Sequence, residues 1–168
     1  NTAPDSETPG DAGGNNVYNV VVHANDGTND TTQNVTITVT DQQSVISGSG
    51  NLVGTGEEDT ISGQSGADSI RGLEGNDVLN GNAGADTLEG GAGADTLNGG
   101  NGNDFLDGGN GNDELQGGLG NDRLRGQNGN DVIGGGDDND TLEGFGGDDT
   151  LTGGDGNDSL LASTGNDV

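Results

Sequence analysis

The chain has 168 residues, of which 38 are glycine and 24% are hydrophobic, and its 30 acidic residues against three basic ones give a formal net charge of −27. This composition is typical of a disordered chain, and so large an acidic excess argues against nucleic acid and anionic membranes as partners. Cysteine is absent, which excludes disulfides, thiolate catalysis and cysteine-based metal sites, and no apolar run approaches the ~20 residues of a membrane-spanning helix.

The N-terminal part of the chain contains two β-branched segments. Val17–Ala24 reads VYNVVVHA, and Val35–Thr40 reads VTITVT, in which valine or isoleucine alternates with threonine. Such alternation is typical of a half-buried strand. The run NDGTND between the two segments is a cluster of turn-forming residues. We therefore expect an antiparallel β-hairpin.

Residues 7–41 resemble the last two strands of cadherin-like domains in large bacterial surface proteins. A β-sandwich usually needs ~100 residues, so we interpret residues 1–41 as the end of a truncated sandwich and residues 42–49 as a linker. The resemblance implies a calcium ligand at Asp26, but the other ligands of such a site are missing and we interpret Asp26 as a turn residue. His23, the only histidine, lies in a predicted strand and is interpreted as a packed or solvent-facing side chain.

From residue 50 onwards the sequence repeats every nine residues. An aliphatic residue follows each of the first twelve repeated aspartates by two positions, and glycine precedes the aspartate by five positions in twelve units and by two in eleven. The unit is G-G-x-G-x-D-x-U-x, where U is aliphatic. The repeated aspartates are Asp59, Asp68, Asp77, Asp86, Asp95, Asp104, Asp113, Asp122, Asp131, Asp140, Asp149, Asp158 and Asp167.

One unit has a single aliphatic side chain and cannot fold alone, so the units must stack, as in other repeat proteins. The triplet x-U-x predicts a very short strand whose middle side chain faces a core. The residues G-G-x-G-x-D predict a turn, in which glycine supplies backbone angles that other residues resist. Two units then form a coil of ~18 residues, and successive coils pair as parallel strands at about 4.8 Å. The aspartates consequently form two columns, one along each edge.

Carboxylates stacked at this spacing repel one another unless cations lie between them. Calcium fits such a column, because it takes about six to eight oxygen ligands from carboxylates and carbonyls. Magnesium demands stricter octahedral geometry, and softer metals prefer nitrogen or sulfur ligands. We hypothesise that folding and calcium binding are coupled, as in other domains that unfold without their metal.

The runs GGNGNDFLD, GGNGNDELQ and GGLGNDRLR resemble the RTX, or haemolysin-type, calcium-binding nonapeptide repeat. The resemblance covers residues 50–168. It implies an all-β fold, a right-handed parallel β-roll stacked on calcium ions, which the antiparallel hairpin of the truncated sandwich precedes. It also implies export by a bacterial type I secretion system, and hence a secreted, extracellular or bacterial cell-surface location.

The resemblance further implies that each calcium ion is bound between two turns that lie two units apart. One site would use Gly99, Asn101 and Asp104 of one turn with Gly118, Gly120 and Asp122 of the next. Seven turns on one edge and six on the other give at most about eleven Ca²⁺ sites. The expected ligands are the thirteen repeated aspartates and the backbone carbonyls of Gly90, Gly99, Asn101, Gly108, Asn110, Gly118 and Gly120.

A few units depart from the pattern. Thr55 and Glu57 replace glycines in the first unit, so we expect weak or absent calcium binding at Asp59. Asp138 and Phe145 interrupt later units, and we expect impaired binding at the turn of residues 135–140. The last unit stops before its aliphatic position, which predicts a frayed final coil in which Asp167 lacks a partner.

No catalytic motif is found, so we expect no enzyme activity from this segment. One interpretation is a calcium-rigidified module of a secreted or surface-attached adhesin, monomeric, whose other domains contact a cell-surface or surface ligand. The alternative is the calcium-binding tail of a secreted protease, lipase or epimerase. The cadherin-like hairpin favours the first, and sequence upstream of Asn1 would distinguish them.

Overall fold

The structure is a computed structural model, and it describes residues 16–25, 30–39 and 44–168. The chain divides into two compact units, Asn1–Gln42 and Gln43–Val168, which are described separately. Every regular element in the described ranges is a β-strand, and no helix in them is long and apolar enough to cross a membrane. The all-β fold class is confirmed.

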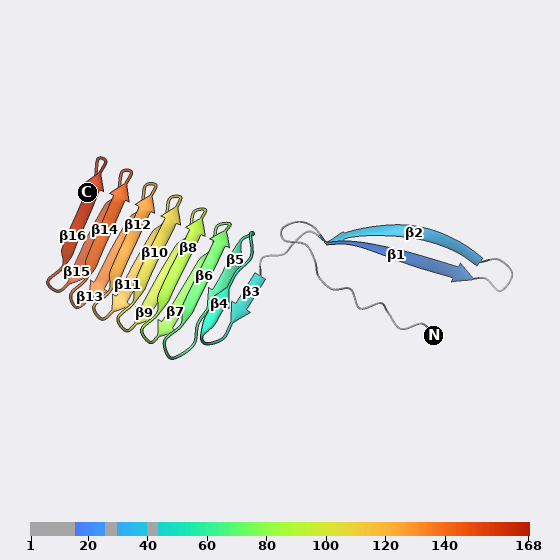
Figure 1. Cartoon of the computed structure of the whole chain (residues 1–168), viewed down its shortest axis with the longest axis horizontal. Helices are drawn as coiled ribbons and strands as arrows, with labels where there is room; N and C mark the ends of the chain where they lie inside the picture. The colour runs from blue at the N-terminus through green and yellow to red at the C-terminus, as the bar shows by residue number, and fades with distance from the viewer. Residues whose placement is uncertain (1–15, 26–29, 40–43) are drawn as a thin grey trace. The chain divides into compact units, whose positions relative to one another are not determined.

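The first unit contains the predicted hairpin. β1 (Asn16–Asn25) and β2 (Asp30–Val39) pair antiparallel along their whole length (Figure 1). Both strands begin before the segments that the β-branched pattern marks. Asn25 and Asp30, the ends of the expected turn, pair with each other; residues 26–29 of that turn, Asp26 among them, lie outside the described residues, as do residues 42 and 43 of the expected linker.

The second unit is the predicted parallel β-roll, built from two seven-stranded sheets (Figure 1). Successive strands alternate between the sheets, whose orders are β16-β14-β12-β10-β8-β6-β4 and β15-β13-β11-β9-β7-β5-β3. Every pairing between these strands is parallel. The strands are β3 (Ser44–Ser47), β4 (Asn51–Val53), β5 (Asp59–Ser62), β6 (Ser69–Glu74), β7 (Val78–Ala83), β8 (Thr87–Ala92), β9 (Thr96–Asn101), β10 (Phe105–Asn110), β11 (Glu114–Leu119), β12 (Arg123–Asn128), β13 (Val132–Asp137), β14 (Thr141–Gly146), β15 (Thr150–Asp155) and β16 (Ser159–Thr164).

The core consists of the aliphatic repeat positions. The register stacks them on one another, so that Leu106 lies opposite Leu88 in one neighbouring strand and Leu124 in the other. Ile46, Leu52 and Leu151 pack against the core and are partly buried. The fully buried members, each at most 1% exposed, are Ile61, Ile70, Leu79, Leu88, Leu97, Leu106, Leu115, Leu124, Ile133 and Leu142.

The strands are longer than the triplet that the pattern predicts. From β6 onwards each covers six residues, and β10 continues through Gly108 to Asn110. Gly108 is buried, and a Cβ there would lie 2.5 Å from Oδ2 of Asp113. The glycine is thus a second inward-facing strand position, whose missing side chain leaves room for the carboxylate. A hydrophobic pattern cannot mark such a position, because the residue is not apolar.

The roll also begins earlier than expected. Ser44–Ser47, within the segment interpreted as a linker, forms β3 and pairs with β5. Ile46 lies opposite Ile61 and packs against the core, so it occupies an aliphatic repeat position. Leu52 follows Ile46 by six residues instead of nine. This first connection is too short for a complete turn of the repeat, which is why the period does not reveal it.

All three arginines lie on one sheet. Arg71 Nε is 3.1 Å from Glu89 Oε2 in the next strand. Arg123 Nη2 and Arg125 Nε both contact Glu143 Oε2, at 3.0 and 2.9 Å. These pairs join neighbouring coils, but they are partly exposed and each contributes about 0–1 kcal/mol.

Replacing Leu106 by alanine should lower the free energy of unfolding in saturating calcium by about 2–5 kcal/mol. The side chain is fully buried between two identical leucines, and the paired coils cannot close the cavity without shifting the turns. Denaturant unfolding followed by circular dichroism measures the change. Leu119→Ala is the control, because Leu119 is 50% exposed and its removal should cost less than about 0.5 kcal/mol; equal losses in the two variants would contradict the prediction.

Candidate metal centre

The repeated aspartates lie at the two edges of the roll, where the turns lead into the strands. Asp104 immediately precedes β10, and Asp113 precedes β11 on the opposite edge. Asp158 and Asp167 are half-buried. The remaining eleven are at most 4% exposed: Asp59, Asp68, Asp77, Asp86, Asp95, Asp104, Asp113, Asp122, Asp131, Asp140 and Asp149.

From Asp77 onwards, one oxygen of each carboxylate accepts a hydrogen bond from the coil before it. The backbone N–H of Asp86 donates to Oδ1 of Asp104 at 2.8 Å, and that of Asp104 donates to Oδ1 of Asp122 at 2.8 Å. On the opposite edge, Asp95 N–H donates to Asp113 Oδ1 at 2.8 Å. The same bond joins every pair of repeated aspartates that lie 18 residues apart. The two predicted columns are therefore continuous hydrogen-bonded ladders.

The last coil takes part in this ladder, contrary to the expectation for Asp167. Its Oδ1 accepts a hydrogen bond from the backbone N–H of Asp149 at 3.0 Å. β16 extends over six residues, although Leu160 is 46% exposed. Asp167 has a partner because the ladder bond points toward the preceding coil.

The second oxygen of nine ladder carboxylates is buried and lacks a hydrogen-bond donor. In the turn of Asp104, Oδ2 lies 2.5 Å from the position that a Cβ of Gly99 would take, and the carbonyl oxygen of Gly117 lies 2.7 Å from the same point. Two acceptors thus approach one another with no hydrogen between them, in a space that only glycine leaves open. Buried acceptors normally have a donor. Oδ2 is buried and unpartnered in nine successive turns, those of Asp77, Asp86, Asp95, Asp104, Asp113, Asp122, Asp131, Asp140 and Asp149.

The turn carbonyls point in two directions. Gly100 O and Gly102 O, at the second and fourth turn positions, face the following coil, where they lie 2.1 and 2.0 Å from the Cβ positions of Gly118 and Gly120. Carbonyls at the first and third positions face the preceding coil, since Leu119 O accepts from Gly102 N–H at 2.8 Å. The gap between two turns of one edge is consequently bordered by carbonyls from both of them.

This geometry changes how the expected carbonyl ligands combine. Between the turns of Asp104 and Asp122, the carbonyls that face one another belong to Gly100 and Gly102 of the first turn and to Gly117 and Leu119 of the second. The sequence-based expectation was the reverse: first and third positions from the earlier coil, and second and fourth positions from the later one. Gly99 O instead approaches Gly81, and Asn101 O accepts from Gly84 N–H at 2.8 Å, both in the preceding coil. A repeat pattern does not show the direction of a carbonyl.

Left-handed backbone angles accompany this carbonyl arrangement. The second turn position has positive φ in every turn from Leu73 onwards, with φ of 106° at Gly100, 95° at Leu73 and 71° at Phe145. Asp138, at a fourth position, has φ of 79°. Such angles cost a residue with a Cβ on the order of 1 kcal/mol or more. The turn of residues 135–140, whose binding was expected to be impaired, therefore keeps the backbone conformation of its neighbours.

Burial raises the pKa of the eight ladder carboxylates from Asp77 to Asp140. It raises the pKa of Asp113 and Asp122 from 3.8 to about 7, and neighbouring carboxylates of the same column add to the effect, while the ladder hydrogen bond opposes it. The pKa values of Asp77 and Asp131 rise to about 6 for the same reasons. Without a cation, these four carboxylates of the folded roll therefore bind protons at about pH 6 to 7. The pKa is also raised by burial at Asp86, Asp95, Asp104 and Asp140.

The donor set of the gaps consists of oxygen alone. Among the described residues, no three carboxylate or histidine side chains gather at one point. A cation in a gap must then take most of its ligands from peptide carbonyls, while the carboxylates supply the negative charge. This mixture fits Ca²⁺ better than Mg²⁺ or softer metals. Bound calcium would supply the positive charge that the unpartnered Oδ2 atoms lack.

A second ladder, which the sequence analysis missed, is formed by asparagine side chains of the turns. Asn103 Oδ1 accepts from Asn121 N–H at 2.9 Å, and Asn112 Oδ1 accepts from Asn130 N–H at 2.8 Å. These side chains bind the following coil, whereas the aspartates bind the preceding one. The frequent asparagine immediately before the repeated aspartate is the pattern that could have revealed this ladder.

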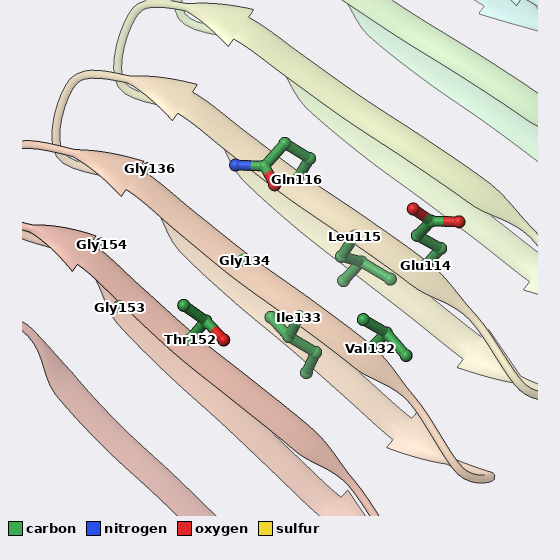
Figure 2. A pocket seen from close by; sticks show the side chains of 10 residues that line it. All are labelled: Glu114, Leu115, Gln116, Val132, Ile133, Gly134, Gly136, Thr152, Gly153 and Gly154. Carbon is green, nitrogen blue, oxygen red and sulfur yellow. The ribbon is translucent and has the colours of Figure 1, made fainter.

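A hollow of about 260 Å³ lies on the outer face of β11, β13 and β15 (Figure 2). It is present because Gly134 has no side chain between Gln116 and Thr152 of the neighbouring strands. Glu114 is the only ionisable residue among the ten that line it.

In calcium-free buffer the roll should become more stable as the pH falls. The raised pKa values mean that the folded columns bind protons which the unfolded chain binds only near pH 3.8. This stabilisation is complete below about pH 4 and is lost as the pH rises through about 6 to 7. Circular dichroism in chelator should show β-structure increasing from about pH 8 to about pH 5.

With calcium present, a fall in pH should instead destabilise the roll, because protons compete with the cation for the carboxylates. The calcium concentration at half-saturation should rise on acidification. Sedimentation at each pH controls for aggregation near the isoelectric point of about 4.1. A calcium-free β signal that stays flat or falls on acidification would contradict the predicted linkage.

Comparison with known protein families agrees with this geometry. The family model of the RTX calcium-binding nonapeptide repeat, which describes four copies of the unit, matches residues 46–79, 53–88, 71–106, 80–115, 107–142 and 143–168. A search of curated proteins finds no match. The matched residues make up more than half of the chain, and they coincide with the parallel roll and its two ladders. The chain therefore belongs to the family of RTX calcium-binding nonapeptide repeat proteins.

Proposed function

We propose that this segment folds when it binds calcium, with ions in the gaps between successive turns of each edge. The observation that supports this is the run of nine buried carboxylates whose Oδ2 atoms have no hydrogen-bond donor. An ionised carboxylate that is buried without a partner is strongly unfavourable. Near neutral pH, a cation removes that penalty without requiring the carboxylate to bind a proton.

The proposed ligands are the ladder aspartates and the turn carbonyls that face each gap. In the gap after Asp104, these are the carboxylates of Asp104 and Asp122 and the carbonyls of Gly100, Gly102, Gly117 and Leu119. Of the other carbonyls expected from the sequence, those of Gly99, Asn101, Gly118 and Gly120 would serve adjacent gaps of the same edge, and those of Gly90, Gly108 and Asn110 would serve gaps of the opposite edge. Every site would then join two coils, so that each bound ion adds to the contact between them.

The proposed setting is a secreted or surface-attached bacterial adhesin in which the roll is a calcium-rigidified segment. Modules that act outside cells bind calcium at about 10⁻⁴ to 10⁻³ M, and a chain with this requirement stays unfolded where calcium is scarce. The family membership supports export. The antiparallel hairpin of β1 and β2 supports a preceding β-sandwich domain of cadherin-like type.

A calcium titration of the full chain tests the proposal. Circular dichroism in chelator at about pH 7.5 should show little β-structure, because the ladder carboxylates are ionised there. Addition of Ca²⁺ should produce a cooperative gain of β signal at about 10⁻⁴ to 10⁻³ M. Mg²⁺ at the same concentrations is the control and should produce much less. A β signal that is complete in chelator and unchanged by millimolar calcium would show that folding does not need the metal.

Replacing Asp113 by asparagine should remove at least one bound calcium ion and raise the concentration of calcium needed for folding. The amide oxygen can still accept the hydrogen bond from Asp95 N–H, so the change removes charge and leaves the ladder bond possible. The matched control is Asp155→Asn, at an exposed turn position. Equal calcium counts for the two variants, measured by elemental analysis after dialysis, would argue against ladder carboxylates as ligands.

A further inference from the structure

The first two repeat turns differ in backbone conformation from those that follow. Thr55 and Gln64 occupy the second turn position before Asp59 and Asp68, and neither has positive φ, whereas the equivalent residue has positive φ in every later turn from Leu73 onwards. Since side chains other than glycine adopt this conformation at Leu73, a missing glycine does not by itself explain the difference.

The carboxylates of these two turns receive hydrogen bonds that the later carboxylates lack. Thr55 donates twice to Asp59 Oδ2, from its backbone N–H at 2.6 Å and from its hydroxyl at 3.0 Å. Gln64 N–H donates to Asp68 Oδ2 at 3.2 Å. In the nine turns from Asp77 to Asp149, the same oxygen has no partner. In the first two turns, a hydrogen-bond donor thus takes the place of the cation that would otherwise neutralise the carboxylate.

Oδ1 of Asp68 also has a hydrogen-bond donor, although no repeated aspartate lies 18 residues before it. Gly50 N–H donates to Asp68 Oδ1 and so replaces the aspartate N–H that performs this task in later coils. Asp59 Oδ1 is buried and has no hydrogen-bond partner in the described part of the chain. In the ladder this oxygen faces the preceding coil, so it does not border the gap toward Asp77.

We propose that the turns of Asp59 and Asp68 form a calcium-free cap on the N-terminal end of the roll. In this cap the donors of Thr55 and Gln64 replace the cation, and the calcium ladder begins with the Asp77/Asp95 gap on one edge and the Asp86/Asp104 gap on the other. The proposal rests on calcium binding in the later gaps as proposed above. Loss of the first gap on each edge leaves at most five calcium sites on the edge with seven turns and four on the edge with six.

The turn conformation, rather than the presence of glycine, then decides which turns bind. The first two turns are excluded although the second of them lacks only one glycine of the repeat. The turn of Asp140 is retained although Asp138 replaces a glycine, because Asp138 adopts φ of 79° and Asp140 Oδ2 is unpartnered. The calcium-filled coils thus stack on two turns whose carboxylates do not need a metal ion at Oδ2.

Counting bound calcium in the full chain tests the cap. The chain and its variants are dialysed to equilibrium at saturating calcium, the ions are counted by elemental analysis, and circular dichroism verifies that each variant is folded. Asp68→Asn should keep the wild-type count, whereas Asp86→Asn should lower it by at least one ion. An equal loss in both variants would overturn the cap, and absence of any bound calcium in the wild type would overturn the proposed function with it.

A pair of glutamine substitutions tests the mechanism. Gln64→Gly completes the repeat in the turn of Asp68 and should raise the count by one ion, because the turn can then adopt the left-handed conformation and free Asp68 Oδ2. Gln127→Gly is the matched control: Gln127 is at the same turn position but already has φ of 77°, and its loss should leave the count unchanged. A count that Gln64→Gly leaves unchanged, or that Gln127→Gly raises equally, would overturn the proposal.

Discussion

The two oxygens of each aspartate from Asp77 to Asp149 have different roles, and the roll depends on that division. Oδ1 accepts an N–H from the coil before it and sets the spacing of the coils without any metal. Oδ2 is buried with no donor, so the same spacing is costly until a cation or a proton arrives. Burial of the aliphatic core cannot outweigh this cost alone, because each unit contributes one buried aliphatic side chain for nine ordered residues.

The other features of the turns follow from the need to bring oxygens together. Gly99 is required because its Cβ would fill the space that Asp104 Oδ2 and Gly117 O share. Left-handed angles persist at Leu73 and Phe145 despite their steric cost. The asparagine ladder binds each coil in the opposite direction from the aspartates. The turns are thus held from both sides, with the acceptors for calcium between them.

Sequence reasoning predicted the features that recur every nine residues and missed those that depend on direction or on a break in register. Leu106 and Asp104 recur in phase, so their stacking and burial could be foreseen. Gly108 was assigned to a turn because a glycine that faces the core looks like a glycine that bends the chain. β3 was missed because Ile46 precedes Leu52 by six residues. The break of the repeat at Thr55 was visible, but not the hydrogen bonds that it donates.

The roll contains two periods that respond differently to a change in length. The core and the ladders have a period of nine residues, because every unit supplies one aliphatic residue and one aspartate. The ion pairs of the outer face join Arg125 to Glu143 across 18 residues. Duplication or loss of one unit between them would preserve the core and the ladders but move Glu143 to the other sheet. Duplication or loss of a whole coil would keep Glu143 on the same sheet as Arg125 and leave its partners to be set by the new neighbouring strand. Addition of a single unit therefore keeps the periods of the core and of the ladders, whereas the pattern of charged side chains on each sheet is inherited in whole coils.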